Sequence, residues 1–259
     1  MNKPKNFLKN RTLTILRLAV YDFKAKYAGS VFGFIWAGVE PIVNVMVYWF
    51  VYSVAANFSW SDDCHYYLWL SVGISAWLFI SEGIKSMTSA FRDYAYLIKK
   101  TGFNKPSVLR IRAISCIFAH IIFLAIVLAL CVYENTFSSA WIYLPLWSAA
   151  IFLFVYSVGR IFALICAKFK DMQNIVGIGL NICFWITPVF WRLSQNVSFP
   201  AGIIKYTPGA VFVNGYRSVL LYGTFDIKAL IYIICIDALI FIIGIPLQKR
   251  MISDIADGL

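Results

Sequence analysis

Six apolar stretches, each close to the length that crosses a lipid bilayer, dominate this chain of 259 residues. They lie near residues 31–56, 66–90, 108–133, 142–167, 172–192 and 227–247. A transmembrane helix needs about 20 mostly apolar residues. Because 61% of the residues are hydrophobic and 14% are charged, a soluble fold of this length could not bury the apolar surface. We therefore expect an all-α integral membrane protein, with six transmembrane helices in one domain over residues 1–259.

The segments between these stretches alternate in charge. Residues 1–30, 91–112 and 168–171 are rich in Lys and Arg, whereas residues 57–65 and 134–141 contain acids and no bases. Lys and Arg accumulate on the cytoplasmic side of membrane proteins. The pattern predicts that both termini are cytoplasmic, and it accounts for the net charge of +11 without nucleic acid as a partner.

Residues 1–30 carry seven basic residues against one acid, Asp22. Apolar residues recur among them at spacings of three and four, at Leu13, Leu16, Val20, Phe23 and Tyr27. This spacing puts an apolar stripe on a helix whose other face is cationic, and such a helix lies in the membrane interface. We expect its cationic face to attract anionic lipid headgroups or the anionic head of a substrate.

Residues 192–226 break the charge rule, because this external segment contains three bases together with several Pro and Gly residues. Its apolar pieces are too short to span the membrane. We expect two short helices within 196–224, one around 200–206 and one around 209–222, that dip part-way into the bilayer. Irregular backbone at that depth is tolerated where it is buried in protein or lines a water-filled cavity.

The sequence contains no nucleotide-binding loop of the form G-x-x-x-x-G-K-[ST], so the chain is not expected to bind ATP by that route. Its two histidines and six cysteines lack the spacing of a metal site. We expect no catalytic residue, metal or cofactor in this chain.

Five ionisable residues lie inside the apolar stretches, at Glu40, Glu82, Lys85, Arg160 and Asp237. Such residues mark either polar contacts between helices or an ion pathway. Glu82 and Lys85 are spaced to pair on one helix face, and Arg160 is close enough to the cytoplasmic end to snorkel. Polar pairing between helices is favoured over a proton-coupled role, since the sequence does not show that the acids meet.

Aromatic residues make up 18% of the chain. Trp and Tyr favour the headgroup level of a membrane, and aromatic rings also stack on the apolar faces of sugars. Trp36, Trp77 and Trp185 lie further into the apolar stretches. These three are candidates for lining a carbohydrate conduit, with lipid-facing packing as the alternative.

Short motifs follow one another along nearly the whole chain. They are Y-D-F-K-A-K-Y-A-G-S at 21–30, F-G-F-I-W at 32–36, E-P at 40–41, L-I-K-K-T-G-F-N-K-P at 97–106, K-D-M at 170–172, T-P-V at 187–189, and Pro208 with Y-R at 216–217 and L-Y-G at 221–223. In this order they resemble the membrane subunits of ABC-2 type exporters of O-antigen, capsule or teichoic acid. The chain departs from that pattern at Tyr21, where Arg or Lys is usual, at Glu40 and Thr207, where Asn is common, and at residues 104–106, where the proline is shifted.

The resemblance implies a homodimer of this chain, assembled with two copies of a separate ATPase that binds ATP and Mg²⁺. It also implies a short cytoplasmic coupling helix that touches the ATPase, and an external gate after the fifth span. The coupling residues would be Tyr94, Leu97, Ile98, Lys99, Lys100 and Phe103. The substrate head-group and cytoplasmic gate would use Arg17, Lys24, Lys26 and Tyr27, and the external gate Pro208, Phe212, Tyr216 and Arg217.

The expected function is export of a lipid-linked polysaccharide, O-antigen on undecaprenyl pyrophosphate, across a bacterial inner membrane. Within the same class, the substrate could instead be capsule, teichoic acid, a small lipid or a drug. An ion-coupled secondary transporter is the alternative from another class, and a clear acidic cluster that would favour it is missing from the apolar stretches. A membrane-embedded glycosyltransferase is disfavoured, because the chain has no sizeable soluble domain.

Overall fold

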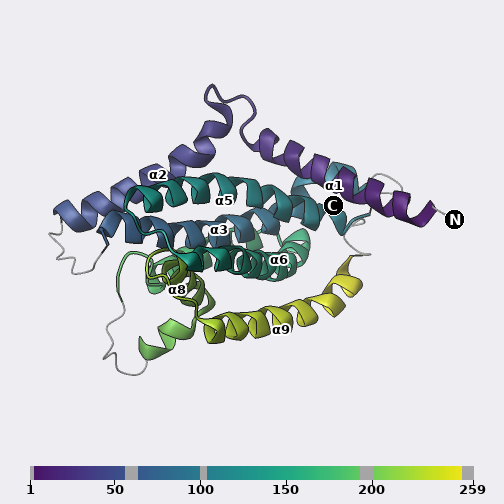
Figure 1. Cartoon of the computed structure of the whole chain (residues 1–259). Coiled ribbons are helices and arrows are strands. Elements are labelled where there is room, and N and C mark those ends of the chain that lie inside the picture. Colours follow the sequence, from purple (N-terminus) through teal and green to yellow (C-terminus); the bar gives the residue numbers. More distant parts are fainter. Residues whose placement is uncertain (1–2, 56–63, 100–103, 193–200, 253–259) are drawn as a thin grey trace.

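The computed structural model describes residues 3–55, 64–99, 104–192 and 201–252, and every regular element among them is helical (Figure 1). In chain order the elements are α1 (Lys3–Lys26), η1 (Gly33–Ile35), α2 (Trp36–Trp49), η2 (Phe50–Ala55), α3 (Tyr66–Asp93), α4 (Ala95–Ile98), α5 (Ser107–Tyr133), η3 (Ser139–Tyr143), α6 (Leu144–Lys168), α7 (Met172–Ile186), η4 (Ala201–Tyr206), α8 (Pro208–Leu220) and α9 (Ile227–Met251). The all-α prediction is confirmed for these residues.

Helix α3 forms the centre of the bundle, and it contacts α2, α5, α6, α7 and α8. In its most apolar window 83% of the residues are buried, against 22–50% for the other long helices. The packing of α3 against five neighbouring helices accounts for this burial. Helices α1 and α2 lie along one side of the bundle and α9 along the other (Figure 1).

Five helical segments are long and apolar enough to cross a membrane: Gly33–Val54, Tyr66–Asp93, Ser107–Tyr133, Ser139–Lys168 and Ile227–Met251. The helix within the predicted span 172–192 ends earlier than expected. Helix α7 stops at Ile186 after 15 residues, about 22 Å of helix, whereas the hydrocarbon layer is about 30 Å thick. Pro188 disfavours helical backbone at the residue before it, and Thr187 is accordingly extended, with φ −72° and ψ 135°. Six crossings therefore stay a prediction.

The N-terminal end of α1 and the C-terminal end of α9 lie at the same end of the bundle, which we call the terminal end (Figure 1). Segments that are distant in the sequence meet at the terminal end, where Lys105 donates a hydrogen bond to the carbonyl of Ile252 at 3.3 Å. At the opposite end, which we call the loop end, the Tyr143 ring stacks on Phe225 with 4.1 Å between centroids.

Helix α1 presents part of its predicted apolar stripe outward. Leu13, Leu16 and Val20 are exposed, whereas Ile15 and Ala19 are buried on the side that faces α5. Outward apolar side chains suit a helix that lies in the membrane interface. The helix ends at Lys26, earlier than the predicted range of 1–30.

The predicted short elements appear in altered form. The expected coupling helix is a single turn, α4, flanked by Lys99 and by residues outside the described ones. The helices expected around 200–206 and 209–222 correspond to the 3₁₀ turn η4 and to α8. The first predicted span is not uniform, because a 3₁₀ turn precedes α2 and a π-helix, η2, follows it.

Candidate functional site: a polar cavity among five helices

A cavity of about 360 Å³ lies among α1, α2, α3, α5 and α7. Polar side chains line much of it, including Lys26, Glu40, Asn44, Ser75, Ser81, Glu82, Lys85, Ser86, Ser115, His120 and Asn181. Aromatic side chains line it as well, namely Phe23, Tyr27, Tyr48, Trp77, Phe79, Phe123 and Phe184. Polar groups within apolar helices are costly unless they face one another, water or a solute. The cavity can therefore accept a polar ligand inside an otherwise apolar bundle.

The structure brings together three of the predicted substrate residues, because Lys26, Tyr27 and Trp77 line this cavity from α1, the turn after it and α3. Trp36 lines an adjoining hollow beside Glu40, Val43 and Asn44 on α2. The two hollows share Glu40 and Asn44.

The other predicted substrate residues lie elsewhere. Arg17 and Lys24 are exposed on α1, and Trp185 is 54% exposed on α7. Sequence reasoning missed Asn44 and Asn181 in the cavity wall. Asn44 could have been found, because it lies one helical turn beyond Glu40, whereas nothing in the sequence places α7 opposite α2.

The acids and bases of the cavity are partly paired. Glu82 and Lys85 form the predicted ion pair at 3.4 Å, and Arg112 contacts Asp22 at 3.1 Å. Among the described residues Glu40 makes no hydrogen bond or ion pair, and Lys26 makes no ion pair. The cavity thus has one base on α1, Lys26, and one acid on α2, Glu40, that make no ion pair with a described residue.

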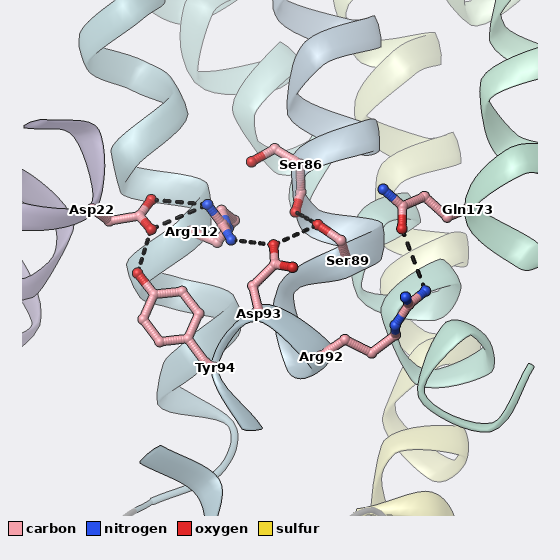
Figure 2. Close-up of polar contacts among 8 residues, drawn as sticks. All are labelled: Asp22, Ser86, Ser89, Arg92, Asp93, Tyr94, Arg112 and Gln173. Atoms are coloured by element: carbon pink, nitrogen blue, oxygen red, sulfur yellow. Dashed lines mark hydrogen bonds and ion pairs between the residues drawn. The ribbon is translucent and has the colours of Figure 1, made fainter. Parts of the chain in front are cut away.

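A charged network joins α1 to the segment between α3 and α5 at the terminal end (Figure 2). Arg112 on α5 lies between two acids, Asp22 on α1 and Asp93 at the end of α3. The Tyr94 hydroxyl donates a hydrogen bond to Asp22, and Ser89 donates one to Asp93 at 2.7 Å. Burial, together with the bond to Asp22, raises the pKa of Tyr94 above its ordinary value, so the hydroxyl stays a donor at neutral pH.

The predicted coupling residues lie next to this network. Tyr94 and Ile98 are buried, Leu97 is half-buried and Lys99 is exposed. Lys100 and Phe103 lie outside the described residues. Arg92 reaches from the end of α3 to the start of α7 and donates to the side chain of Gln173 at 3.4 Å (Figure 2). It also donates to the carbonyl of Lys170 at 3.4 Å.

Helix α8 is anchored by three consecutive residues at the loop end of the bundle. Gly215 faces the Trp147 ring so closely that an added Cβ would lie 2.6 Å from it. The Tyr216 hydroxyl bonds His120 of α5 at 3.1 Å and Ser148 of α6 at 2.9 Å. Arg217 follows, and it binds α3 and the end of α7.

Arg217 is 2% exposed, and its guanidinium stacks on the Trp69 ring at 3.2 Å from the centroid. It donates to the carbonyls of Pro188 at 2.7 Å, Val189 at 2.6 Å and Trp69 at 3.3 Å. The predicted gate residues Phe212, Tyr216 and Arg217 are therefore buried, and Pro208 is half-buried.

Comparison with known proteins places these features in a family. The family model described as ABC-2 type transporter matches residues 14–221, more than half of the chain. This chain belongs to the ABC-2 type transporter family. The ABC-2 region contains the whole cavity lining, the Asp22–Arg112–Asp93 network and the α8 anchor, and it ends before α9.

Three curated relatives of this ABC-2 protein carry the same name, O-antigen export system permease protein RfbA. One from Klebsiella pneumoniae is 23% identical over 89% of this chain and 88% of its own length. A second from that organism matches to the same extent. The relative from Myxococcus xanthus is 24% identical over 79% of each chain.

The described residues contain no group of three or more His, Cys, Asp or Glu side chains placed to hold a metal ion. The polar cavity is the candidate site of this ABC-2 protein, because its polar and aromatic side chains line a common space inside the bundle. It is suited to binding and guiding a solute between helices.

Proposed function

We propose that this chain is the pore-forming membrane subunit of an ATP-driven exporter of a lipid-linked polysaccharide. Its substrate is O-antigen on undecaprenyl pyrophosphate, moved from the cytoplasmic to the external side of the bacterial inner membrane. The proposal depends chiefly on the cavity, whose polar and aromatic lining in an ABC-2 transporter suits a sugar chain. The names of the three relatives, which match across 79–89% of this chain, support O-antigen as the glycan.

In this proposal the chain crosses the membrane six times, and α7 together with residues 187–192 forms the fifth crossing. The terminal end is cytoplasmic, as are both termini, because Lys and Arg are concentrated in the segments that meet there. Helix α8 and η4 then occupy the external side as short elements that enter the membrane.

A second copy of this chain faces α2 and α7, whose outward sides are apolar. Val43 and Val47 on α2, and Ile178 and Ile182 on α7, are each at least half exposed, and exposed apolar side chains that gather on one surface are typical of an interaction site. Two copies of the ATPase bind at the terminal end, and they hold the ATP and Mg²⁺ for which this chain has no binding loop.

Coupling runs through the segment from Tyr94 to Pro106. Tyr94 binds Asp22 of α1, and Arg112 links Asp22 to Asp93 at the end of α3. A movement of this segment by the ATPase therefore shifts α1, which carries Lys26 at the cavity. ATP binding would bias the helices between two arrangements, and the cationic residues of α1 would receive the pyrophosphate head.

Reconstitution tests this function directly. The chain and its partner ATPase are reconstituted in proteoliposomes. A lipid-pyrophosphate-linked polysaccharide is supplied on the membrane side that corresponds to the cytoplasm, and the glycan that reaches the other side is measured. ATP-dependent translocation is expected, with no effect of collapsing proton or sodium gradients. Translocation that stops when an ion gradient is collapsed and continues without ATP would instead indicate a secondary transporter.

A further inference from the structure

Glu40 has an unusual position on the cavity wall. It lies one turn after Trp36 and one turn before Asn44, so the three side chains share one face of α2. It is exposed, it lines both hollows, and it makes no hydrogen bond or ion pair within the described part of the chain. An ionisable side chain inside a span that is not paired with the protein calls for a polar occupant.

The other acids of the cavity do not share this property. Asp22 is held by Arg112 at 3.1 Å, and Glu82 is held by Lys85 at 3.4 Å. Glu40 is therefore the one acid of the described cavity lining that makes no ion pair with a described residue.

The two cavity charges without an ion pair, Lys26 and Glu40, lie at different distances from the terminal end. Lys26 ends α1, which extends toward the terminal end, whereas α2 leads away from that end (Figure 1). Glu40 is seven residues into the helical segment that begins at Gly33, about 10 Å along a helix axis. A molecule that enters from the terminal end meets the base first and the acid afterwards.

The chemistry of this wall suits uncharged sugars. A carboxylate accepts strong hydrogen bonds from hydroxyl groups, the amides of Asn44 and Asn181 both donate and accept, and the Trp36 ring offers an apolar face. Glu40 is exposed in the free chain, but a sugar that fills the hollow displaces water from it, and Coulomb repulsion between like charges is then stronger than in water. A sugar that carries a carboxylate or phosphate is therefore disfavoured beside Glu40.

We propose that Glu40 is a charge filter, which hydrogen-bonds neutral sugars with Asn44 and Asn181 and slows glycans whose repeats are anionic. This inference rests on the proposed polysaccharide export. The pyrophosphate of the carrier passes Glu40 once per molecule, whereas an acidic polymer places a charge there with every repeat. Glu40 consequently discriminates between glycan polymers and not between their lipid carriers.

The experiment uses the full chain with its partner ATPase in proteoliposomes. Two substrates on the same lipid pyrophosphate are compared, a polymer of neutral hexoses and one of equal length with a hexuronic acid in each repeat. The wild type should export the neutral polymer about tenfold faster, equivalent to about 1.4 kcal/mol. Glu40→Gln should bring the two rates within about twofold, and Glu40→Asp should preserve the difference.

Asp171→Asn is the matched control, because it removes one acid that is exposed at the start of α7 and is not part of the cavity lining. It should leave the rate ratio unchanged, and shortening the acidic polymer to one repeat should reduce the discrimination. Equal wild-type rates for both polymers, or a ratio that survives Glu40→Gln, would overturn the filter alone. Failure of the wild type to export either polymer would overturn the proposed function itself.

Discussion

Replacing Arg217 with methionine should loosen α8 from the bundle. Methionine keeps much of the side-chain volume but removes the guanidinium, which binds three backbone carbonyls and stacks on Trp69. Two of those carbonyls belong to Pro188 and Val189, just beyond the end of α7. After the change both carbonyls lose their donor, which lies 29 residues from Pro188 and 28 residues from Val189 in the sequence.

The magnitude follows from these contacts. A hydrogen bond to a charged group contributes about 1.5–3 kcal/mol, so three bonds give an upper bound of roughly 5–9 kcal/mol. Burial of the guanidinium opposes this gain. Polar contacts measured inside membrane proteins average about 0.6 kcal/mol each, so three of them give a lower bound of about 2 kcal/mol. We therefore expect Arg217→Met to destabilise the chain by about 3 kcal/mol, between the two bounds.

Thermal unfolding of the purified protein in detergent measures the effect. A chain of this size loses about 2–4 °C in Tm per kcal/mol, so a decrease of about 6–12 °C is expected. Lys228→Met is the matched control, because Lys228 is an exposed base on α9, and its Tm should stay within about 2 °C of the wild type. An Arg217→Met Tm as close to the wild type as the control's would refute the idea that Arg217 anchors α8.

Three further predictions concern other contacts. A double-mutant cycle with Asp22→Asn and Arg112→Gln should give a coupling energy of about 2 kcal/mol in thermal unfolding. Gly215→Ala, whose methyl group would lie 2.6 Å from an indole ring of α6, should cost about 1–3 kcal/mol by overpacking. Glu134 has its pKa lowered from 4.5 by the hydrogen bond from Tyr67. Its stabilisation is therefore present above pH 4.5 and is lost as the pH falls through the folded value. Tyr67→Phe should reduce this pH dependence without removing it, because His65 also bonds Glu134 at 2.8 Å.

The sequence predicted the helices well, because length and apolarity alone determine which segments can cross a bilayer. Five of the six expected spans have the required length. The early end of α7 was predictable in principle, since a proline at 188 disfavours helix at the preceding residue. Hydrophobicity obscured it, because residues 187–192 remain mostly apolar after the helix stops.

The contacts between helices could not be predicted from one sequence. Arg160 was expected to snorkel, but it is 3% exposed and donates to the carbonyl of Phe241. Its guanidinium fits there because Gly244 has no side chain to occupy the space. Asp22 and Arg112 are likewise 90 residues apart. Periodicity identifies a helix face, but it does not say which distant residue that face will meet.

The burial of the predicted gate residues changes what an external gate can be in the proposed exporter. Arg217 binds the carbonyls that follow α7, so α8 cannot move far from the end of α7 without breaking those bonds. Helix α7 in turn supplies Asn181 and Phe184 to the cavity wall. A substrate that displaces α7 therefore pulls on α8 through the backbone at Pro188 and Val189. In the proposed exporter, opening at the loop end would therefore move α7 and α8 together, because Arg217 links them.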